Sequence, residues 1–240
     1  MLQVREPHDL PSDFLPDAMP CGRRTGEVTR DMEELLRGTP LLRRTLRAKE
    51  YVFRAGQPRQ SLFLVHAGFF KTSLASADGR EKITGFRMRG DLLGLDSLGT
   101  GSYACDAIAL DIGEVWELPY SDLCGSLPEF EQRVTSFLAA EIRRDWNLML
   151  ALATLSADQR VVSFLLDMAT RLGTLGFSRQ HMILRMTRAD LGSFLALKLE
   201  TVTRALSRLQ DKGLIAVKGR EITLRDPASM NDLLQAADCA

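Results

Sequence analysis

The stretch from Thr187 to Gly213 places the strongest constraint on what this chain can fold into, because it reads as two short helices joined by a tight turn. Thr187 can cap the first helix with its hydroxyl group, and Asp190 adds negative charge to the first turn, where the helix dipole favours it. The second helix is predicted over about 199–211, with its apolar side chains on one side: Val202, Ala205, Leu206 and Leu209. Gly213 follows as a residue free to adopt the positive φ that ends a helix.

Polar and basic side chains occupy the opposite side of this second helix. They are Glu200, Thr203, Arg204, Ser207 and Arg208. A helix face of this kind suits the base edges in the major groove of DNA, although many polar helix faces are simply solvated. The charge distribution favours DNA, since the whole chain balances 31 basic against 31 acidic residues whereas residues 198–220 hold six basic and two acidic ones.

The residues that follow predict a winged helix-turn-helix. The runs Leu214–Val217 and Glu221–Leu224 read as strands, and Lys218 and Arg220 give the turn between them a basic tip. Three more elements are predicted nearby: a helix over 157–172, a short strand over 182–186 and a fraying helical tail from Pro227.

The N-terminal half of the sequence has a different pattern of apolar residues. Between about residues 46 and 118, short apolar runs alternate with glycine-bearing turns, which indicates a small antiparallel barrel or roll. The runs are 51–53, 61–65, 69–74, 83–88 and 115–118. Ahead of them a short helix is predicted over 29–38, and the first 30 or so residues, with four prolines in their first 20 positions, are expected to form an extended or poorly ordered arm.

A long helix is predicted over 131–155, and it carries a heptad pattern. Leu138, Ile142, Asp145, Met149 and Leu152 recur at alternating steps of four and three residues. This pattern favours pairing with an identical helix in a homodimer, and the alternative is a helix packed on its own barrel. In the dimer, the two copies of Asp145 would face each other as like charges.

Composition and motifs narrow the class of protein. No apolar run approaches the roughly 20 residues that a membrane span needs, and the N-terminus lacks the basic start and apolar core of a signal peptide. The four cysteines lie far apart without a CxxC pair, so disulfides are not expected and the location is predicted to be cytoplasmic. With three histidines and no HExxH motif, catalytic triad or phosphate-binding glycine loop, the chain is not predicted to be an enzyme.

Several segments, in the right order, resemble the CRP/FNR superfamily of bacterial transcription regulators, and its FNR branch most closely. They are 82–86 with 90–94, 141–145 and 186–192. The resemblance covers about 46–224 and implies an α+β fold: a cyclic-nucleotide-binding-like β-roll, a long dimerisation helix and a C-terminal winged helix-turn-helix. The expected domains are an N-terminal arm (1–30), a β-roll sensor domain (31–130), the dimerisation helix (131–156) and a winged-helix DNA-binding domain (157–240).

The resemblance also implies a DNA target. In the FNR branch an E-x-x-S-R pattern is aimed at a TTGAT-type half-site, and here Glu200, Thr203 and Arg204 stand at the matching positions. Glu200 would accept from a cytosine amino group and Arg204 would donate to guanine. Thr203 replaces serine, keeping the hydroxyl and adding a methyl group. Lys198 offers a phosphate contact. Lys218 and Arg220 at the wing tip and the capping Thr187 are further candidates for contact with DNA.

The expected function is therefore a homodimeric transcription activator that reads a TTGAT-N4-ATCAA palindrome in double-stranded DNA and works with RNA polymerase. The turn 78–80 matches a hairpin that contacts the polymerase sigma factor in FNR, but Arg80 replaces an acidic residue there. Two alternatives stay open: a dimeric effector-binding adaptor that has lost DNA binding, and a regulator that senses redox state or gas through haem or a thiol.

The sensor positions depart from those of both named branches. A CRP-like cyclic-nucleotide pocket uses a Gly-Glu pair and an Arg-Ser pair, whereas Gly94-Leu95 and Ala104-Cys105 stand at these positions here. An anionic cyclic phosphate would lack its counter-charge, so cyclic-nucleotide binding is not expected.

Neither of the family's iron cofactors is expected. An FNR-type iron–sulfur cluster needs four cysteine thiolates; this chain has only Cys21 in the N-terminal region, and Trp116 stands at the β-roll ligand position. Cys105, Cys124 and Cys239 are interpreted as ordinary apolar residues. Haem would need a ligand such as His66, the histidine within the β-roll, and a lone histidine is more often structural; His8 and His181 lie outside the roll. No cofactor is predicted, and the effector stays open.

Overall fold

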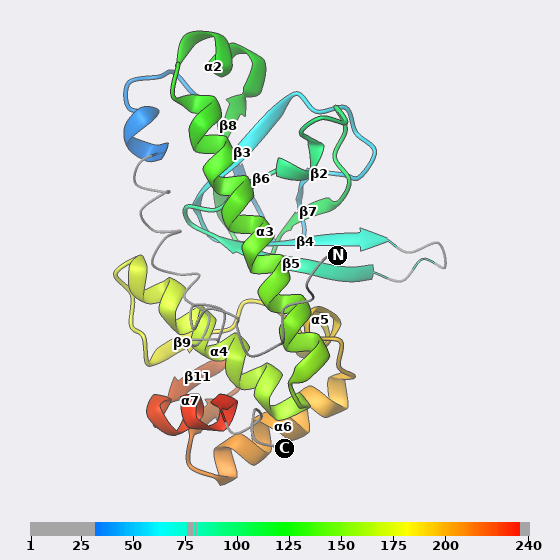
Figure 1. The fold of residues 1–240 in the computed structure, drawn as a ribbon, viewed down its shortest axis with the longest axis vertical. Helices are drawn as coiled ribbons and strands as arrows, with labels where there is room; N and C mark the ends of the chain where they lie inside the picture. The colour runs from blue at the N-terminus through cyan, green and yellow to red at the C-terminus, as the bar shows by residue number, and fades with distance from the viewer. Residues whose placement is uncertain (1–31, 76–78, 80, 236–240) are drawn as a thin grey trace, which may run out of the picture.

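The N-terminal part of the molecule is a β-roll. The computed structural model describes residues 32–75, 79 and 81–235 of the 240-residue chain. Two antiparallel four-stranded sheets, ordered β1-β8-β3-β6 and β2-β7-β4-β5, face each other (Figure 1). The strands are β1 (Arg43–Leu46), β2 (Tyr51–Phe53), β3 (Ser61–Ala67), β4 (Phe69–Ala75), β5 (Glu81–Met88), β6 (Leu92–Leu93), β7 (Asp106–Ala109) and β8 (Gly113–Pro119).

All five apolar runs picked out in the sequence are strands of this roll, which confirms the predicted antiparallel architecture. Three strands, β1, β6 and β7, were not predicted. They are two to four residues long, and such short segments carry too few side chains to show an alternating pattern. Between the sheets, Tyr103 stacks on Phe53 with ring centroids 3.9 Å apart, and its hydroxyl donates to the carbonyl of Ser61.

A long helix joins the roll to the rest of the molecule. After α2 (Tyr120–Ser126), helix α3 (Phe130–Thr154) confirms the helix predicted over 131–155. Its first half packs on the roll through Phe130, Val134 and Phe137. Its second half leaves a stripe of large apolar side chains exposed, with relative exposures of 42–61%: Ile142, Trp146, Met149 and Leu150. The helix therefore packs on its own roll at one end and presents an uncovered apolar face at the other.

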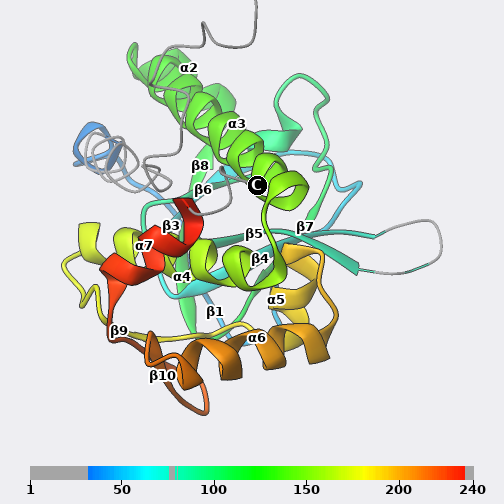
Figure 2. The same ribbon diagram turned by 60° about the horizontal axis from the view of Figure 1, so that its bottom comes forward.

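The C-terminal part is a helical domain with a small sheet. It consists of α4 (Ala157–Thr174), β9 (His181–Ile183), α5 (Arg188–Leu195), α6 (Leu199–Asp211), β10 (Ile215–Lys218), β11 (Glu221–Leu224) and α7 (Pro227–Gln235), with β11 between β10 and β9. Figures 1 and 2 both place α6 at the end of the molecule opposite α2. The winged helix-turn-helix predicted from the sequence is confirmed.

The structure corrects three details of the sequence prediction. The tail from Pro227 forms the ordered helix α7 as far as Gln235, the last described residue: Met230 is fully buried, and the Gln159 side-chain amide donates to Leu233 O at 2.9 Å. The strand predicted over 182–186 is shorter, because β9 ends at Ile183. Of the helix predicted over 29–38, only 32–35 is helical among the described residues, and the arm 1–30 lies outside them. No helix in the described part of the chain has the length and apolar character to cross a membrane.

Helix α5 covers the outer edge of β5, the last strand of its sheet. The Ser193 hydroxyl accepts from the backbone N–H of Ile83 at 3.0 Å and donates to Glu81 O at 3.3 Å, and the Lys82 ammonium donates to Ser193 O. An open sheet edge carries unpaired backbone groups, and here a serine of the helix-turn-helix pairs them. The C-terminal domain is thus docked on the roll through hydrogen bonds between side chains and backbone groups.

An aromatic cluster backs this edge. Phe86 of β5, Phe164 of α4 and Phe194 of α5 meet edge to face, with ring centroids 5.2–6.0 Å apart. These three side chains belong to one hydrophobic core that β5 shares with the whole C-terminal domain. The two parts of the chain therefore bury apolar surface against each other as well as sharing hydrogen bonds.

Asp190 ties the cap of α5 to the roll. One carboxylate oxygen lies 2.9 Å from the Lys71 ammonium, with both side chains 14% exposed, while the other accepts from the Thr187 N–H at 3.0 Å. Burial alone would raise the pKa of Asp190, but the hydrogen bonds from Thr187 and Lys71 lower it. A lowered pKa contributes stability above the ordinary aspartate value of about 3.9, and that contribution is lost as the pH falls through the lowered pKa.

Two substitutions separate the roles of Asp190. Lys71→Met leaves the helix cap in place and removes the ion pair with Asp190, together with a second one from Lys71 to Glu81. We expect it to lower the free energy of unfolding by about 1–3 kcal/mol because charge-assisted hydrogen bonds are lost. Asp190→Ala also removes the helix cap, and should lower it by about 1 kcal/mol more. Urea denaturation followed by circular dichroism measures both values.

Lys212→Met is the matched control, since Lys212 is exposed at the end of α6, and it should stay within about 0.5 kcal/mol of wild type. The double variant Lys71→Met/Asp190→Ala should show a coupling energy of at least about 0.5 kcal/mol between the two positions. Strict additivity would mean that the ion pair does not hold α5 against the roll.

Candidate nucleic-acid interface

The turn between α5 and α6 depends on a close backbone approach. Leu197 N–H donates to Gly192 O at 2.8 Å, and a Cβ atom at Gly192 would lie only 2.7 Å from Leu197 O. Ala196 takes the left-handed conformation, with φ 54°, which lets the chain reverse within three residues. At the start of α5, Thr187 and Asp190 form a capping box, which confirms the predicted cap.

Helix α6 has the two faces that the sequence predicted. The four apolar side chains predicted to be buried are 0–3% exposed in the domain core: Val202, Ala205, Leu206 and Leu209. Leu199, at the start of the helix, is 46% exposed. Glu200, Arg204 and Ser207 are exposed on the other side, and Thr203 is half-buried. Gly213 ends the helix with φ 73°, as predicted. The polar face of α6 therefore points outward at the end of the molecule.

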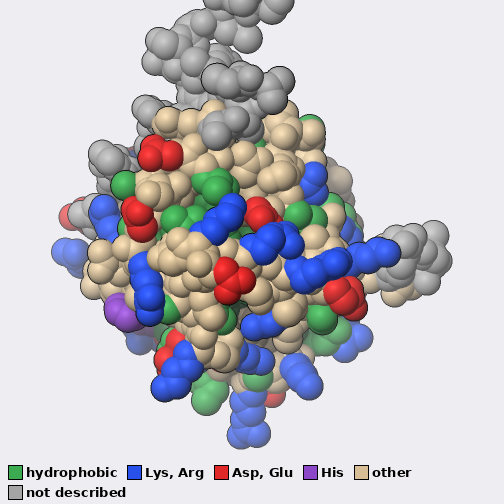
Figure 3. All heavy atoms as spheres, turned by 90° about the horizontal axis from the view of Figure 1, so that it is seen from below, with side chains coloured by type: hydrophobic (Ala, Val, Ile, Leu, Met, Phe, Trp, Pro, Cys, Tyr) green, Lys and Arg blue, Asp and Glu red, His purple; other side chains and the backbone are tan. Residues whose placement is uncertain are grey.

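Glu200 and Arg204 are free to meet a ligand. Neither side chain forms a hydrogen bond or an ion pair with any residue in the described ranges 32–75, 79 and 81–235. They stand one helical turn apart and so share one face. Figure 3 looks onto this end of the molecule and shows Lys and Arg side chains spread over it. Carboxylate and guanidinium groups held in this way are suited to the base edges of a major groove.

Other candidates from the sequence are already engaged inside the protein. The Arg208 guanidinium forms an ion pair with Asp158 of α4, with Nε 2.9 Å from Oδ2. Ser207 Oγ donates to Thr203 O at 3.2 Å, and the Thr187 hydroxyl is used in the capping box. These three residues would have to share or exchange a hydrogen bond in order to bind DNA.

The remaining basic candidates lie at the edges of the α6 face. Lys198 is the exposed N-cap residue of α6 and makes no capping hydrogen bond through its side chain. Lys218 and Arg220 are exposed at the β10–β11 turn, where Gly219 has φ 63°. Cations on both sides of a recognition helix are placed as phosphate contacts require.

One residue of this surface was not identified from the sequence. Arg188, the first residue of α5, is exposed, and its Nη1 donates to the Thr203 hydroxyl at 3.3 Å. It thereby joins the start of α5 to the middle of the polar face of α6. The available signal was its place directly after the capping Thr187, because the N-terminal turn of a helix is a common contact for phosphate.

Comparisons with known proteins agree with this geometry. Residues 43–125 match the model of the cyclic nucleotide-binding domain, and residues 159–233 match that of the Crp-like helix-turn-helix domain. The fumarate and nitrate reduction regulatory protein of Escherichia coli (strain K12) is 35% identical over 185 residues, which are 76% of this chain and 74% of that protein. The chain belongs to the CRP/FNR family of transcription regulators.

Other members of the CRP/FNR family support the same assignment. Electron transport regulator A of Shewanella oneidensis is 36% identical over 185 residues, covering 76% of this chain and 74% of that protein. The structure of FixK2 from Bradyrhizobium japonicum superimposes with a TM-score of 0.72 at 30% identity, covering 81% of this chain and 97% of that one. The chain is therefore a DNA-binding transcription regulator and not an enzyme, as the sequence predicted.

The nucleotide pocket of other CRP/FNR proteins does not fit a cyclic phosphate here. The Asp96 carboxylate accepts from the backbone N–H groups of Ala104 and Cys105 at 2.6 and 3.1 Å. A carboxylate therefore already occupies the two amide donors at the positions where the family pattern would hold the phosphate. Leu95, which stands in place of the family's glutamate, is buried. The negative charge of Asp96 beside these amides opposes the binding of an anion.

The cysteine and histidine side chains are also poorly arranged for an iron cofactor. Burial and the nearby Asp96 raise the pKa of Cys105 to about 12, which keeps this thiol protonated, whereas cluster ligands are thiolates. His66 stacks on Trp116 with ring centroids 4.5 Å apart. In the described part of the chain, no three His, Cys, Asp or Glu side chains converge as metal ligands would. Cys21 and Cys239 lie outside it.

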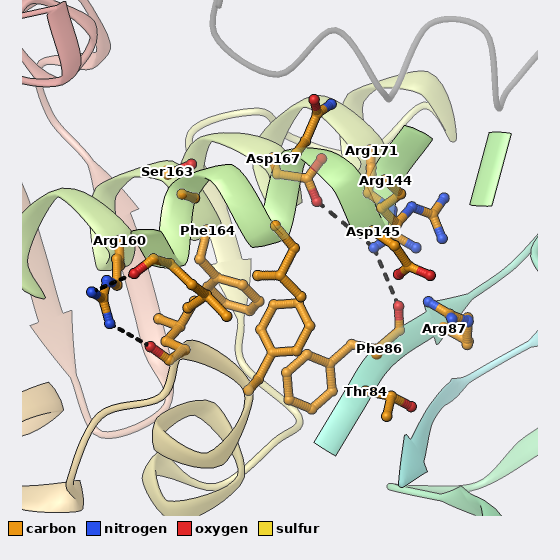
Figure 4. A pocket seen from close by; sticks show the side chains of 17 residues that line it. Thr84, Phe86, Arg87, Arg144, Asp145, Arg160, Ser163, Phe164, Asp167 and Arg171 are labelled. Atoms are coloured by element: carbon orange, nitrogen blue, oxygen red, sulfur yellow. Dashed lines mark hydrogen bonds and ion pairs between the residues drawn. The ribbon is translucent and has the colours of Figure 1, made fainter. Parts of the chain in front are cut away.

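A small cavity lies where β5, α3, α4 and α5 meet (Figure 4). It encloses about 50 Å³, which is room for only a handful of water molecules. Phe86 and Phe164 form its apolar side, and Arg160 spans one end. The Arg160 guanidinium donates to three backbone carbonyls, Leu152 O at 2.8 Å, Leu155 O at 2.9 Å and Leu195 O at 3.2 Å. The cavity lies at the junction between these helices and is too small to hold a nucleotide.

The helix-turn-helix should be sensitive to one methyl group at Gly192. We expect Gly192→Ala to lower the free energy of unfolding by about 1–3 kcal/mol, because the added Cβ would overlap Leu197 O, a backbone atom that cannot move aside alone. The matched control is Gly125→Ala in α2, where a Cβ meets nothing within 4 Å. There the helix propensity of alanine should leave stability unchanged or raise it by up to about 1 kcal/mol. If the two variants shift the melting temperature equally in thermal denaturation, the close approach of Gly192 to Leu197 O is contradicted.

Proposed function

We propose that this protein is a homodimeric transcription activator that binds TTGAT-N4-ATCAA sites in double-stranded DNA. The observation that carries the proposal is the exposed face of α6, on which Glu200, Thr203 and Arg204 stand in the spacing of the FNR recognition pattern. Glu200 would accept a hydrogen bond from the cytosine amino group and Arg204 would donate to O6 and N7 of guanine in the G·C pair of the half-site. Lys198, Lys218 and Arg220 would contact the flanking phosphates.

A palindromic site calls for a two-fold dimer, and α3 supplies a candidate surface. Of the heptad residues, Ile142 and Met149 are exposed and Asp145 lies beside them, while Leu138 packs partly on the roll and Leu152 lines the cavity at the joint. Trp146 and Leu150 widen the exposed apolar stripe. Such a stripe on a helix is typical of a surface covered by a second copy.

We also propose that the protein activates transcription through RNA polymerase and acts in the cytoplasm. The names of its relatives describe regulators, and residues 159–233 match the Crp-like helix-turn-helix domain. The turn matched to the polymerase contact in FNR cannot support this step, since residues 76–78 and 80 lie outside the described ranges. In vitro transcription from a promoter with one TTGAT-N4-ATCAA site tests it: added protein should raise transcript yield, and a fall would indicate a repressor.

We propose that neither an iron–sulfur cluster, a cyclic nucleotide nor haem controls this regulator. The support is the carboxylate of Asp96 at the amides of Ala104 and Cys105 and the raised pKa of the Cys105 thiol. An absorbance spectrum and a mass analysis of protein purified without oxygen test this. Visible absorption bands, bound iron or a bound nucleotide would contradict the proposal, and haem absorption bands would favour the alternative of a haem-based redox or gas sensor.

Base recognition by Arg204 is the first test of the DNA site. Arg204→Ala should weaken binding to a TTGAT-N4-ATCAA duplex by about 1–3 kcal/mol and relax the preference for guanine, because a bidentate contact to the base is lost. Lys218→Ala should weaken binding to all duplexes about equally and reduce the salt dependence by about one counterion. Gel-shift titrations at several salt concentrations measure both effects.

The matched control is Arg47→Ala, an exposed arginine in the β1–β2 turn of the roll, which should bind like wild type. If wild-type protein shows no preference for this duplex over random DNA at moderate salt, the half-site assignment is wrong. An adaptor that has lost DNA binding would show no binding even at low salt.

Two substitutions test the proposed dimer surface: one removes an attractive contact and the other removes a repulsive one. Trp146→Ala should weaken dimerisation about tenfold or more, since a buried tryptophan often dominates an interface. Asp145→Ala should tighten it, because burial and the neighbouring Glu141 raise the pKa of Asp145 and a second Asp145 would oppose it across the seam. Sedimentation equilibrium measures the dimer constants. Gln132→Ala, an exposed change in the first half of α3, is the control, and unchanged constants for both test variants would place the dimer elsewhere.

A further inference from the structure

We propose that Thr203 recognises a thymine through its methyl group and not through its hydroxyl. This inference rests on the proposed half-site and adds a specificity determinant to it. Serine, which stands at this position in the FNR pattern, has only the hydroxyl. The methyl group of Thr203 is therefore the group by which this chain differs from the FNR pattern on the polar face of α6.

The hydroxyl of Thr203 is already used inside the protein. Its oxygen lies 3.0 Å from Leu199 O, to which it donates, and it accepts from Arg188 Nη1 at 3.3 Å. A hydroxyl group has one donor and two acceptor positions, so its donor and one acceptor are occupied. A hydrogen bond donated to a base edge would require the bond to Leu199 O to break.

The same two hydrogen bonds fix the position of the methyl group. Threonine in a helix divides between two side-chain rotamers because its oxygen can bond a carbonyl in the preceding turn. The bond to Leu199 O selects one of them, and Arg188 holds the oxygen from the side of α5. With the oxygen turned back toward the helix, Cγ2 is the group left to face a partner.

The neighbouring residues identify which thymines come within reach. Thr203 precedes Arg204 and lies three residues after Glu200, so it shares their face of α6. Glu200 and Arg204 are assigned to the single G·C pair of TTGAT. The thymines next to that pair are the one directly 5′ of the guanine and the one opposite the following adenine. A thymine presents its C5 methyl group in the major groove, where it can pack on another methyl.

The size of the effect follows from the area of one methyl contact. Burying one methyl or methylene group contributes about 0.8 kcal/mol, which is about a fourfold change in Kd. Replacing thymine by deoxyuridine removes only this methyl group from the DNA and leaves every hydrogen-bonding group of the base in place. The substitution therefore separates the methyl contact from hydrogen bonding.

The experiment titrates full-length protein against TTGAT-N4-ATCAA duplexes in which each thymine in turn is replaced by deoxyuridine, symmetrically in both half-sites. Wild type should lose about fourfold in affinity per half-site contact at one of the two thymines beside the G·C pair and little at the outer thymines. Thr203→Val, which keeps the branched shape without the hydroxyl, should retain this sensitivity. Thr203→Ser should bind the thymine duplex about as weakly as wild type binds the deoxyuridine duplex, with no further loss on replacement.

Each alternative outcome is informative. If Thr203→Ser keeps wild-type affinity and Thr203→Val loses it, the hydroxyl reads the base and the inference is overturned. A wild-type preference for the site that does not respond to deoxyuridine overturns this inference alone and leaves the proposed half-site standing. No preference for the site over random DNA overturns both. Equal binding of all variants to a random duplex at low salt shows that the substituted proteins are folded.

Discussion

The arrangement of this regulator depends on how α5 closes the free edge of β5. A strand edge inside a domain junction must have its backbone groups paired, and Ser193 supplies both a donor and an acceptor for that purpose. Beside it, Asp190 caps α5 and binds Lys71 of the neighbouring strand. Asp190, in the first turn of α5, therefore completes the capping box and also fixes this helix to the roll. Local helix stability and domain docking are coupled through one carboxylate.

A buried ionic cluster holds the other side of the same junction. Burial would raise the pKa of Asp91, but Arg171 of α4, Arg144 of α3 and Arg87 of β5 lower it, and Met88 N–H donates to it at 2.8 Å. Arg144 and Arg171 thus pair with one carboxylate that is 5% exposed, while Arg87 forms its own ion pair with Glu141 of α3. Such charges are stable only while they stay paired, so the roll, α3 and α4 must meet in one defined arrangement.

Local patterns made much of this structure predictable, and long-range contacts account for what was missed. The two faces of α6 follow from residue spacing alone, and the cap at Thr187 and the stop at Gly213 are encoded within a few residues. The burial of Met230 depends on α4, which lies about 60 residues earlier, so its short helix reads as a tail. The link from Arg188 to Thr203 spans the helix-turn-helix, and arginine at the start of a helix has no pattern that specifies its partner. The hydrogen bonds between Ser193 and β5 could not be predicted for the same reason, because no sequence pattern specifies them.

The joint between α3 and α5 bears on how a signal could reach the DNA-binding face. Arg160 donates to carbonyls at the C-terminal ends of α3 and α5, where the helix dipoles favour a cation. The Arg160 guanidinium therefore links the half of α3 that carries the exposed apolar stripe to α5, the first helix of the helix-turn-helix. Any displacement of the end of α3, for example on pairing with a second copy, has to break these hydrogen bonds or carry α5 with it. Such a connection requires no ligand in the nucleotide pocket, where Asp96 already occupies the backbone amides.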